Sequence, residues 1–348
     1  MLSLFENMIK KTLLLLFTVL SSNMFIIGQT QPLAWYDGPI IDMHVHARHG
    51  DKNGPSGLCY PVSNIVPYFD PQENWGTTFQ EAFKNPNCSN PIWSATTDEA
   101  MREETLAAMK KNRVIGVVDG EPELVLKWQK EAPDHVIPSM ELEFLDRVSA
   151  DSIRSLITNH GFRVLGEIAI QYQGIAPNDP QLDPYWKVCQ EQDIPIAIHL
   201  GCGPPGVVQL GSPNYNAAFS SPYLLEEVLK KFPKLRVSVM HFGEPLVDEM
   251  IAMMYLYPRL YVDIGGIQWA YPTEYFYEYQ LKKMVAAGFS KRIMHGSDNM
   301  IWPGMIYESI KIIQEAPFLT AEQKADILYN NAARFLRLSK EEIAKHHN

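Results

Sequence analysis

The chain has few cysteines and no excess of positive charge, and both shortages exclude common classes of protein. It contains four cysteines in 348 residues, and none has the spacing of a zinc finger. Lys and Arg total 30 against 40 Asp and Glu, which gives a formal net charge of -10. A nucleic-acid-binding surface is usually basic, so this balance disfavours a nucleic-acid partner. Long blocks of like charge, which are typical of interaction tails, are also missing.

Two catalytic motifs are missing as well. No Gly-x-Ser-x-Gly sequence is present to support a serine hydrolase. The glycine-rich stretch 201–206 lacks both the P-loop lysine and the strand-to-helix spacing of a dinucleotide-binding loop. We interpret this stretch as a tight turn that shapes a pocket.

Residues 1–28 have the pattern of a secretory signal peptide. Lys10 and Lys11 precede the apolar run 13–20, and cleavage is expected near Gly28. An uncleaved anchor is the alternative, but Ser and Asn interrupt the run, and a membrane span needs about 20 mostly apolar residues. We therefore predict a periplasmic or extracellular protein without a stable membrane anchor.

Export changes how the cysteines are interpreted. Cys59 and Cys88 lie in a stretch rich in Pro, Gly and Asn, and in an oxidising compartment they could form a disulfide. Cys189 lies in a predicted helix and is expected to be a buried packing residue.

Eight apolar, strand-like runs recur along the chain, with amphipathic helical stretches between them. Most of these runs show no steady polar alternation, as expected for strands that are buried on both faces of a parallel sheet. Strand and helix alternate to a count of eight, which predicts an α/β fold of the (β/α)8 TIM-barrel type as a single domain over residues 35–340. The expected strands are 39–46, 114–119, 136–142, 164–170, 194–200, 236–242, 260–265 and 292–297.

Two long inserts break this rhythm. Residues 47–95 follow the first strand, and residues 201–221 follow the fifth. Both inserts begin at carboxyl ends of strands, where barrel active sites form, so we expect them to be walls or lids of the pocket. The tail 320–345 is predicted to be helical.

Residues that can bind a metal ion close several of the expected strands. In the first strand His44 and His46 point to the same side, because side chains alternate along a strand. Later runs close on four further candidates, and a barrel would bring all of these ends together at one mouth. These candidates are Glu167, His199, His241 and Asp298. Asp42, two residues before His44, is a candidate hydrogen-bond partner behind the ligands.

In this order, these residues resemble the amidohydrolase superfamily. The similarity is greatest to the amidohydrolase-related (amidohydrolase 2) branch, which includes proteins similar to aminocarboxymuconate-semialdehyde decarboxylase. Further matching stretches are 166–168, 241–243, 295–298 and 330–335. The resemblance implies that His44, His46, His199 and Asp298 bind metal. It leaves His241 as either a catalytic histidine or a ligand to a second ion.

Glu167 is the position at which the sequence leaves the number of ions open. In binuclear members of the superfamily a carboxylated Lys or a Glu at this point bridges two ions. The stretch around Glu167 also resembles the TatD-like deoxyribonucleases. The alternative is a carboxylate that orients the substrate or acts as a base.

The donor set favours Zn²⁺, as one or two ions, because zinc accepts imidazole nitrogen and carboxylate oxygen. Asp298 is expected to take the proton of the attacking water and return it to the leaving group, and His241 to stabilise the developing oxyanion. Arg48 and Cys202 are candidate substrate-binding residues.

We therefore predict an exported metal-dependent hydrolase that cleaves an amide, lactone or ester in a small molecule. A decarboxylase of an unsaturated or aromatic acid is the first alternative, and a TatD-like phosphodiesterase is the second. A non-enzymatic binding protein is a third reading, and the complete ligand set argues against it. The oligomeric state stays open, a homo-oligomer included.

Overall fold

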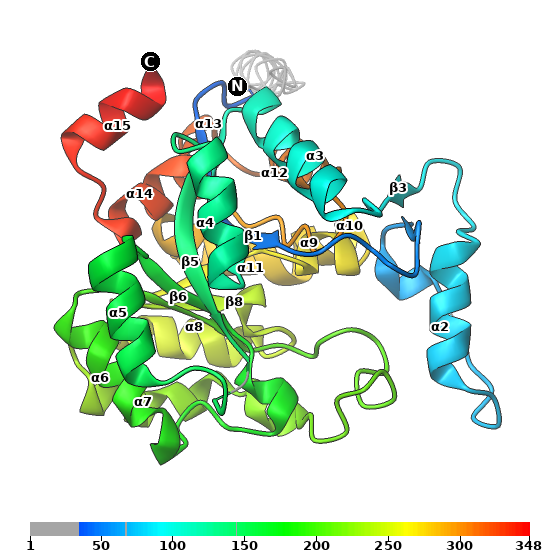
Figure 1. Cartoon of the computed structure of the whole chain (residues 1–348), viewed down its shortest axis with the longest axis horizontal. Helices are drawn as coiled ribbons and strands as arrows, with labels where there is room; N and C mark the ends of the chain where they lie inside the picture. The colour runs from blue at the N-terminus through cyan, green and yellow to red at the C-terminus, as the bar shows by residue number, and fades with distance from the viewer. Residues whose placement is uncertain (1–34, 67, 144) are drawn as a thin grey trace, which may run out of the picture. The chain divides into compact units, whose positions relative to one another are not determined.

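Eight parallel strands form the centre of the protein in a computed structural model that describes residues 35–66, 68–143 and 145–348 (Figure 1). The predicted signal peptide lies outside the described residues. The strands are β1 (Ile40–Ala47), β4 (Val114–Gly120), β5 (Val136–Leu142), β6 (Val164–Ile168), β7 (Ile196–His199), β8 (Val237–Met240), β9 (Leu260–Asp263) and β10 (Ile293–Met294). Their spatial order follows the chain from β1 to β10.

The barrel is nearly closed, because backbone hydrogen bonds connect the first strand to the segment that begins with the last. Met43 N donates to His295 O at 2.9 Å, and Asp298 N donates to His44 O at 2.8 Å. The predicted TIM-barrel class is confirmed. Closure also places Asp298 beside the histidines of β1, from which it is separated by more than 250 residues of sequence.

Helices connect the successive strands. The first group is α3 (Asp98–Lys111), α4 (Pro122–Glu131), α5 (Ala150–His160), α6 (Asp183–Glu191), α7 (Leu225–Lys231) and α8 (Val247–Leu256). The second group is α9 (Ile267–Ala270), α10 (Thr273–Tyr275), the π-helix η7 (Phe276–Leu281), α11 (Lys282–Ala286), α12 (Met305–Gln314), α13 (Ala321–Ala325), the π-helix η9 (Asp326–Asn330), α14 (Asn331–Leu336) and α15 (Lys340–His347). Short 3-10 turns are η1 (Val62–Asn64), η2 (Ile170–Gln173), η3 (Pro180–Leu182), η4 (Ala217–Ser220), η5 (Pro222–Leu224), η6 (His241–Gly243) and η8 (Ser290–Arg292). None of the described helices has both the length and the apolar character that a membrane span requires.

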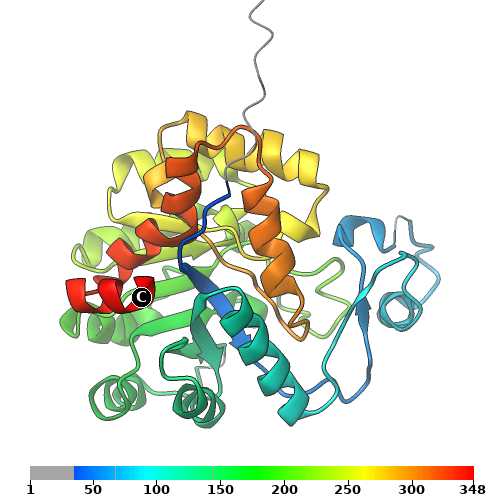
Figure 2. The same cartoon turned by 90° about the horizontal axis from the view of Figure 1, so that it is seen from above.

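Helix α3 shows how the sequence sets these connections. The side chain of Thr97 accepts a hydrogen bond from Ala100 N, which caps the first turn. Acidic residues occupy that turn and lysines occupy the last one, so both ends complement the helix dipole. Met101 and Leu106 are buried, and α3 packs beside α12 (Figure 2).

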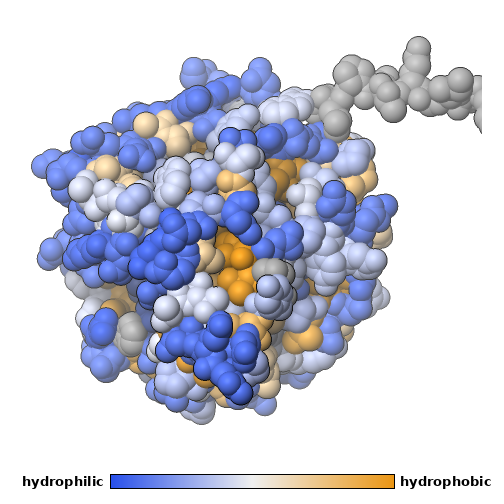
Figure 3. Space-filling view, turned by 90° about the vertical axis from the view of Figure 1, so that its right-hand side faces the viewer, coloured by the Kyte–Doolittle hydropathy of each residue, from blue (hydrophilic) through white to orange (hydrophobic). Residues whose placement is uncertain are grey.

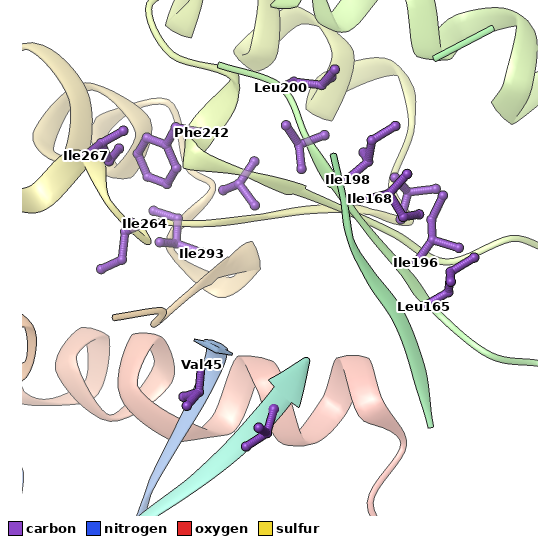
Figure 4. Packing of buried hydrophobic residues seen from close by; sticks show 14 of the residues in the cluster. Val45, Leu165, Ile168, Ile196, Ile198, Leu200, Phe242, Ile264, Ile267 and Ile293 are labelled. Atoms are coloured by element: carbon purple, nitrogen blue, oxygen red, sulfur yellow. The ribbon is translucent and has the colours of Figure 1, made fainter. Parts of the chain in front are cut away.

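Branched aliphatic side chains from neighbouring strands fill the space between the sheet and the helices. Val45, Leu165 and Ile198 are fully buried in this cluster (Figure 4). Burial of one such side chain stabilises the fold by about 1.5–3 kcal/mol before the entropy of ordering is subtracted. The packed strands therefore hold the residues at their carboxyl ends in fixed positions.

The insert 47–95 projects from one side of the barrel in both views (Figures 1 and 2). It contains a short antiparallel pair, β2 (Gly57–Leu58) with β3 (Ile92–Trp93), and helix α2 (Trp75–Lys84). A disulfide joins Cys59 to Cys88 and closes this insert, which is the pairing that an oxidising compartment would allow. Cys189 is buried, as expected.

The strands that carry the later donors are shorter than the sequence predicts. β8 ends at Met240 and β10 ends at Met294, whereas runs to 242 and 297 are expected from the apolar pattern. His241 and Asp298 both have positive φ, of 58° and 52°, which is incompatible with a continuing strand. Both donors therefore lie on turns just beyond their strands.

Candidate active site

Six side chains meet at the carboxyl end of the barrel, and they form two groups that share Glu167. In the first group Glu167 Oε2 lies 3.9 Å from His44 Nε2 and 3.7 Å from His46 Nε2. Asp298 Oδ1 completes this group, at 3.1 Å from His46 Nε2 and 3.7 Å from His44 Nε2. The structure thus brings residues from β1, β6 and the turn after β10 to one point.

The second group uses the other oxygen of the same carboxylate. Glu167 Oε1 lies 2.7 Å from His199 Nδ1 and 3.4 Å from His241 Nε2. These two imidazole nitrogens are 2.9 Å apart. All six sequence-predicted donors are therefore together, and Glu167 lies between the two sets.

The nitrogen of each imidazole that faces away from these groups has a neighbour of its own. Asp119 Oδ1 lies 2.6 Å from His46 Nδ1, and Asp263 Oδ2 lies 3.5 Å from His44 Nδ1. The Tyr215 hydroxyl lies 3.1 Å from His199 Nε2. Gly265 O lies 2.8 Å from His241 Nδ1 and accepts a hydrogen bond from it. Such partners fix the orientation and the tautomer of a metal-binding histidine.

The carboxylates of the site are held in their charged form. Burial alone would raise the pKa of Glu167, but hydrogen bonds with His199 and His241 hold that pKa well below its usual value. Burial likewise opposes ionisation of Asp298, and the neighbouring imidazoles of His44 and His46 lower its pKa. Burial, together with the adjacent His241, lowers the pKa of His199, which favours a neutral ring. Burial opposes protonation of His44, His46 and His241 as well, but the neighbouring carboxylates raise the pKa of these three rings. A metal ion binds anionic oxygens and neutral imidazoles, so it would take the place of these protons.

The donor groups fit a divalent cation. His44 is 1% exposed, and neither of its ring nitrogens has a hydrogen-bond partner among the described residues. Such a polar group is costly to bury unless something binds it. The ligand atoms of His44, His46 and Glu167 lie within 4.8 Å of one another, as do those of Glu167, His199 and His241. Imidazole with carboxylate is a donor set that suits zinc and related ions.

Two adjacent glycines allow the backbone to approach these donors closely. A Cβ at Gly265 would lie 2.5 Å from His44 Nδ1, and a Cβ at Gly266 would lie 2.6 Å from Asp298 Oδ2. Gly266 also has φ of 73°, which disfavours other residues. Any side chain at either position would displace a donor.

A cavity of about 740 Å³ opens above the donors, and the two inserts form part of its walls. The 47–95 insert contributes Leu58, Phe79 and Phe83, and the 201–221 insert contributes Gly201 to Pro205. The face that carries α2 and β3 shows an apolar area surrounded by hydrophilic residues (Figure 3). The prediction that these inserts are pocket walls is confirmed.

The two predicted substrate-binding residues both line this cavity. The guanidinium of Arg48 is paired with the carboxylate of Glu141, and its Nη2 lies 3.4 Å from His46 Nδ1. The Cys202 thiol lies at the start of the second insert, and burial raises its pKa. Its sulfur is 4.0 Å from Glu244 O.

Asp42 is a buried hydrogen-bond acceptor behind His44, as expected, and its partners are backbone groups. Its Oδ1 accepts hydrogen bonds from the backbone of His44 at 3.0 Å and of Ser297 at 2.9 Å. It therefore fixes the two segments that close the barrel. Asp119 and Asp263, near the ends of β4 and β9, are the carboxylates that lie beside the β1 imidazoles.

Tyr215 and Glu244 could not be found from the sequence pattern. Tyr215 lies inside the second insert, far from any strand end, and its hydroxyl donates to Gly201 O at 2.5 Å. Glu244 follows the turn after β8. Only the path of the loops places these two side chains beside the donors.

The fold is a TIM barrel, and its mouth carries a cluster of His, Glu and Asp side chains that could hold a metal ion. The sequence profile of the amidohydrolase family matches residues 41–338. The chain belongs to this family, within its amidohydrolase 2 branch. A comparison with curated proteins gives no match.

Solved structures with the same architecture support the fold. An uncharacterized TIM-barrel protein from Bordetella bronchiseptica is 18% identical, with a TM-score of 0.56 over 89% of this chain and 100% of its own. The 5-carboxyvanillate decarboxylase of Sphingomonas paucimobilis is 13% identical, with a TM-score of 0.53 over 86% and 99%. A probable 2-pyrone-4,6-dicarboxylic acid hydrolase from Acinetobacter baumannii is 12% identical, with a TM-score of 0.53 over 86% and 99%. At these identities the likeness shows the fold alone.

Proposed function

We propose that the protein is a metal-dependent hydrolase that uses activated water to cleave an amide, lactone or ester in a small molecule. The position of Glu167 supports this proposal most strongly, because its two oxygens face different donor groups. Oε2 faces His44 and His46, and Oε1 faces His199 and His241. A carboxylate in this position is suited to bridge two cations, and two-cation sites commonly activate water for hydrolysis.

The roles of the side chains follow from their positions. A divalent ion held here supplies Lewis-acid activation, which lowers the pKa of water from ~15.7 to about 7. Asp298 lies between the β1 histidines and His241, and its lowered pKa keeps it ionised and ready to accept the proton of the attacking water. It then returns this proton to the leaving group.

His241 would hold the second ion through Nε2, and that ion would stabilise negative charge on the substrate oxygen. Its Nδ1 donates to Gly265 O, so Nε2 faces the donor groups. Burial alone would lower the pKa of His241, but the hydrogen bond with Glu167 raises it above its usual value. A side chain held in this way is positioned before the substrate arrives, which is the condition for effective transition-state stabilisation.

Two measurements test this proposal. Elemental analysis of protein purified without added metal is expected to find about two ions per chain, one for each donor group. Protein loaded with Zn²⁺ is then assayed against panels of lactones, esters, amides and aromatic acids. Hydrolysis that stops on chelation and returns with metal supports the proposal. Release of CO2 from an acid without consumption of water would instead identify a decarboxylase and refute it.

We also propose that the protein acts outside the cytoplasm. The signal-like residues 1–28 motivate this proposal, and the Cys59–Cys88 disulfide supports it, because such bonds persist in oxidising compartments. Fractionation of cells that express the full chain is expected to recover a shortened protein outside the cytoplasm. Full-length, reduced protein in the cytoplasmic fraction would contradict the proposal.

A further inference from the structure

The cationic side chains that line the cavity are already engaged. Among the described residues that line it, the Lys and Arg side chains are Arg48 and Lys84. Arg48 is ion-paired with Glu141, and Lys84 is an exposed residue of α2 whose Nζ lies 3.1 Å from Glu81 Oε1. A substrate carboxylate would therefore compete with an existing partner for either cation.

The carboxylate of Glu244, in contrast, is not paired with a cationic side chain. This cavity-lining residue is 3% exposed, and its carboxylate forms no ion pair with a Lys or Arg of the described chain, although the nearby His241 ring favours its charged form. Its Oε2 accepts a hydrogen bond from the Tyr271 hydroxyl at 2.6 Å. An ionised carboxylate offers about four acceptor sites, so one partner leaves capacity for a donor from a ligand.

Burial of this carboxylate without a cation is costly. A cation or a hydroxyl that entered the cavity would relieve this cost, because a buried charge is stabilised when it is paired and hydrogen-bonded.

An aromatic wall accompanies this acceptor. Phe79 and Phe83 of α2 have ring centroids 4.9 Å apart, and Phe83 stacks on Trp302 at 5.5 Å with an interplanar angle of 21°. All three rings line the cavity, together with Leu58 and Ile301. Flat apolar surfaces of this kind bind planar rings.

The wall is anchored to the opposite insert. Trp75, on the same helix, packs 5.7 Å from Phe79, and its Nε1 donates to Pro205 O at 2.9 Å. Pro205 also lines the cavity, as does Tyr271 beside Glu244. One cavity therefore contains both an aromatic wall and an acidic acceptor without a cationic partner.

We propose that the cavity selects ring-containing substrates that are neutral or cationic, and that Glu244 accepts a hydrogen bond from a hydroxyl or ammonium group of the substrate. This inference rests on the proposed hydrolase, because it names the substrate class of the same site. The aromatic wall holds the ring, and the donor groups hold the bond to be cleaved. A substrate that carries a free carboxylate on the Glu244 side is disfavoured by repulsion.

Three probes that share a ring and differ in charge test this inference: benzylamine, benzyl alcohol and benzoate. Their dissociation constants are measured by calorimetry with zinc-loaded protein. Glu244→Gln is expected to weaken benzylamine by about 10-fold to 100-fold, as for the loss of a charge-assisted hydrogen bond. The same change should leave benzoate unchanged or tighter. Glu278→Gln, which removes the same charge from an exposed site on η7, is the control and should alter none of the three.

Two further variants separate folding from recognition. Tyr271→Phe removes a neighbour of the carboxylate and keeps its charge, so benzylamine binding should survive. Phe83→Leu should weaken all three probes by a similar factor. An equal effect of Glu244→Gln on benzylamine and benzoate would overturn the inference, and so would a wild-type cavity that binds none of the probes.

The inference and the hydrolase proposal can fail separately. If the charge preference holds but no ester, lactone or amide is cleaved, the proposed reaction is wrong and the ligand class stands. If hydrolysis is observed while Glu244→Gln leaves the charge preference intact, the ligand class is wrong and the reaction stands.

Discussion

Replacement of Glu167 by glutamine tests whether one carboxylate serves both donor groups. The change keeps the size of the side chain and removes its charge. It also leaves a single oxygen, because an amide nitrogen donates hydrogen bonds and cannot bind a cation. In the native site, one oxygen faces His44 and His46 and the other faces His199 and His241.

The size of the effect follows from this geometry. An amide can supply an oxygen to only one group, so the metal content should fall from about two ions to about one per chain. The group that loses its oxygen keeps its other donors but loses a charged ligand. Mutation of a residue that only hydrogen-bonds to a metal ligand costs about 10-fold to 100-fold in metal affinity. Loss of a ligand itself should cost more, so we expect the affinity for this ion to fall by at least about 100-fold, or about 2.7 kcal/mol.

The assay is elemental analysis after dialysis, combined with competition against a chelator of known affinity. Glu278→Gln is the matched control, because Glu278 is an exposed residue that pairs with Lys282 on the helix surface. Glu167→Gln should lose hydrolytic activity together with the ion, and circular dichroism should show an intact fold. Unchanged metal content and affinity in Glu167→Gln would refute the bridging role, and one ion in the native protein would also refute it.

Further predictions concern Asp298 as the proton shuttle, the glycines that lie against the donors, and the disulfide. Asp298→Asn should keep the fold and lower kcat by at least about 100-fold, since the amide cannot accept the proton; wild-type rates would exclude Asp298 as the shuttle. Gly266→Ala should lower kcat by about 10-fold or more, because its Cβ would lie 2.6 Å from Asp298 Oδ2, and unaltered kinetics would show that the backbone relaxes freely. Replacement of Cys59 and Cys88 by serine should lower the free energy of unfolding in urea by about 3–4 kcal/mol, as loop entropy predicts for 29 residues, and equal stability would argue against the bond.

Periodicity and residue type were sufficient to predict the barrel. Runs of Val, Ile and Met without polar alternation can be stabilised only where both faces of a strand are covered. Eight such runs with helices between them leave few alternatives to closure. The histidines of β1 were also identifiable, because alternation along a strand places His44 and His46 on one side whatever the partner strand is.

The positions of the later donors were harder to predict. His241 and Asp298 follow apolar runs, so their place near the barrel mouth was expected. The positive φ of both residues was not expected, because the local sequence does not specify at which residue the chain leaves the strand. That turn orients His241 toward Glu167 and Asp298 toward His46, and the residue at which the turn begins depends on the packed neighbours of β8 and β10.

The sequence alone determined the class of fold and most of the donors, because both follow from local patterns of residue type and spacing. Only the tertiary structure decided that Glu167 lies between two groups, that Arg48 is already paired, and that Glu244 is buried without a cation. These facts depend on distances between segments that are remote along the chain. Such distances are set by closure of the barrel and by the packing of the inserts, which no single segment encodes.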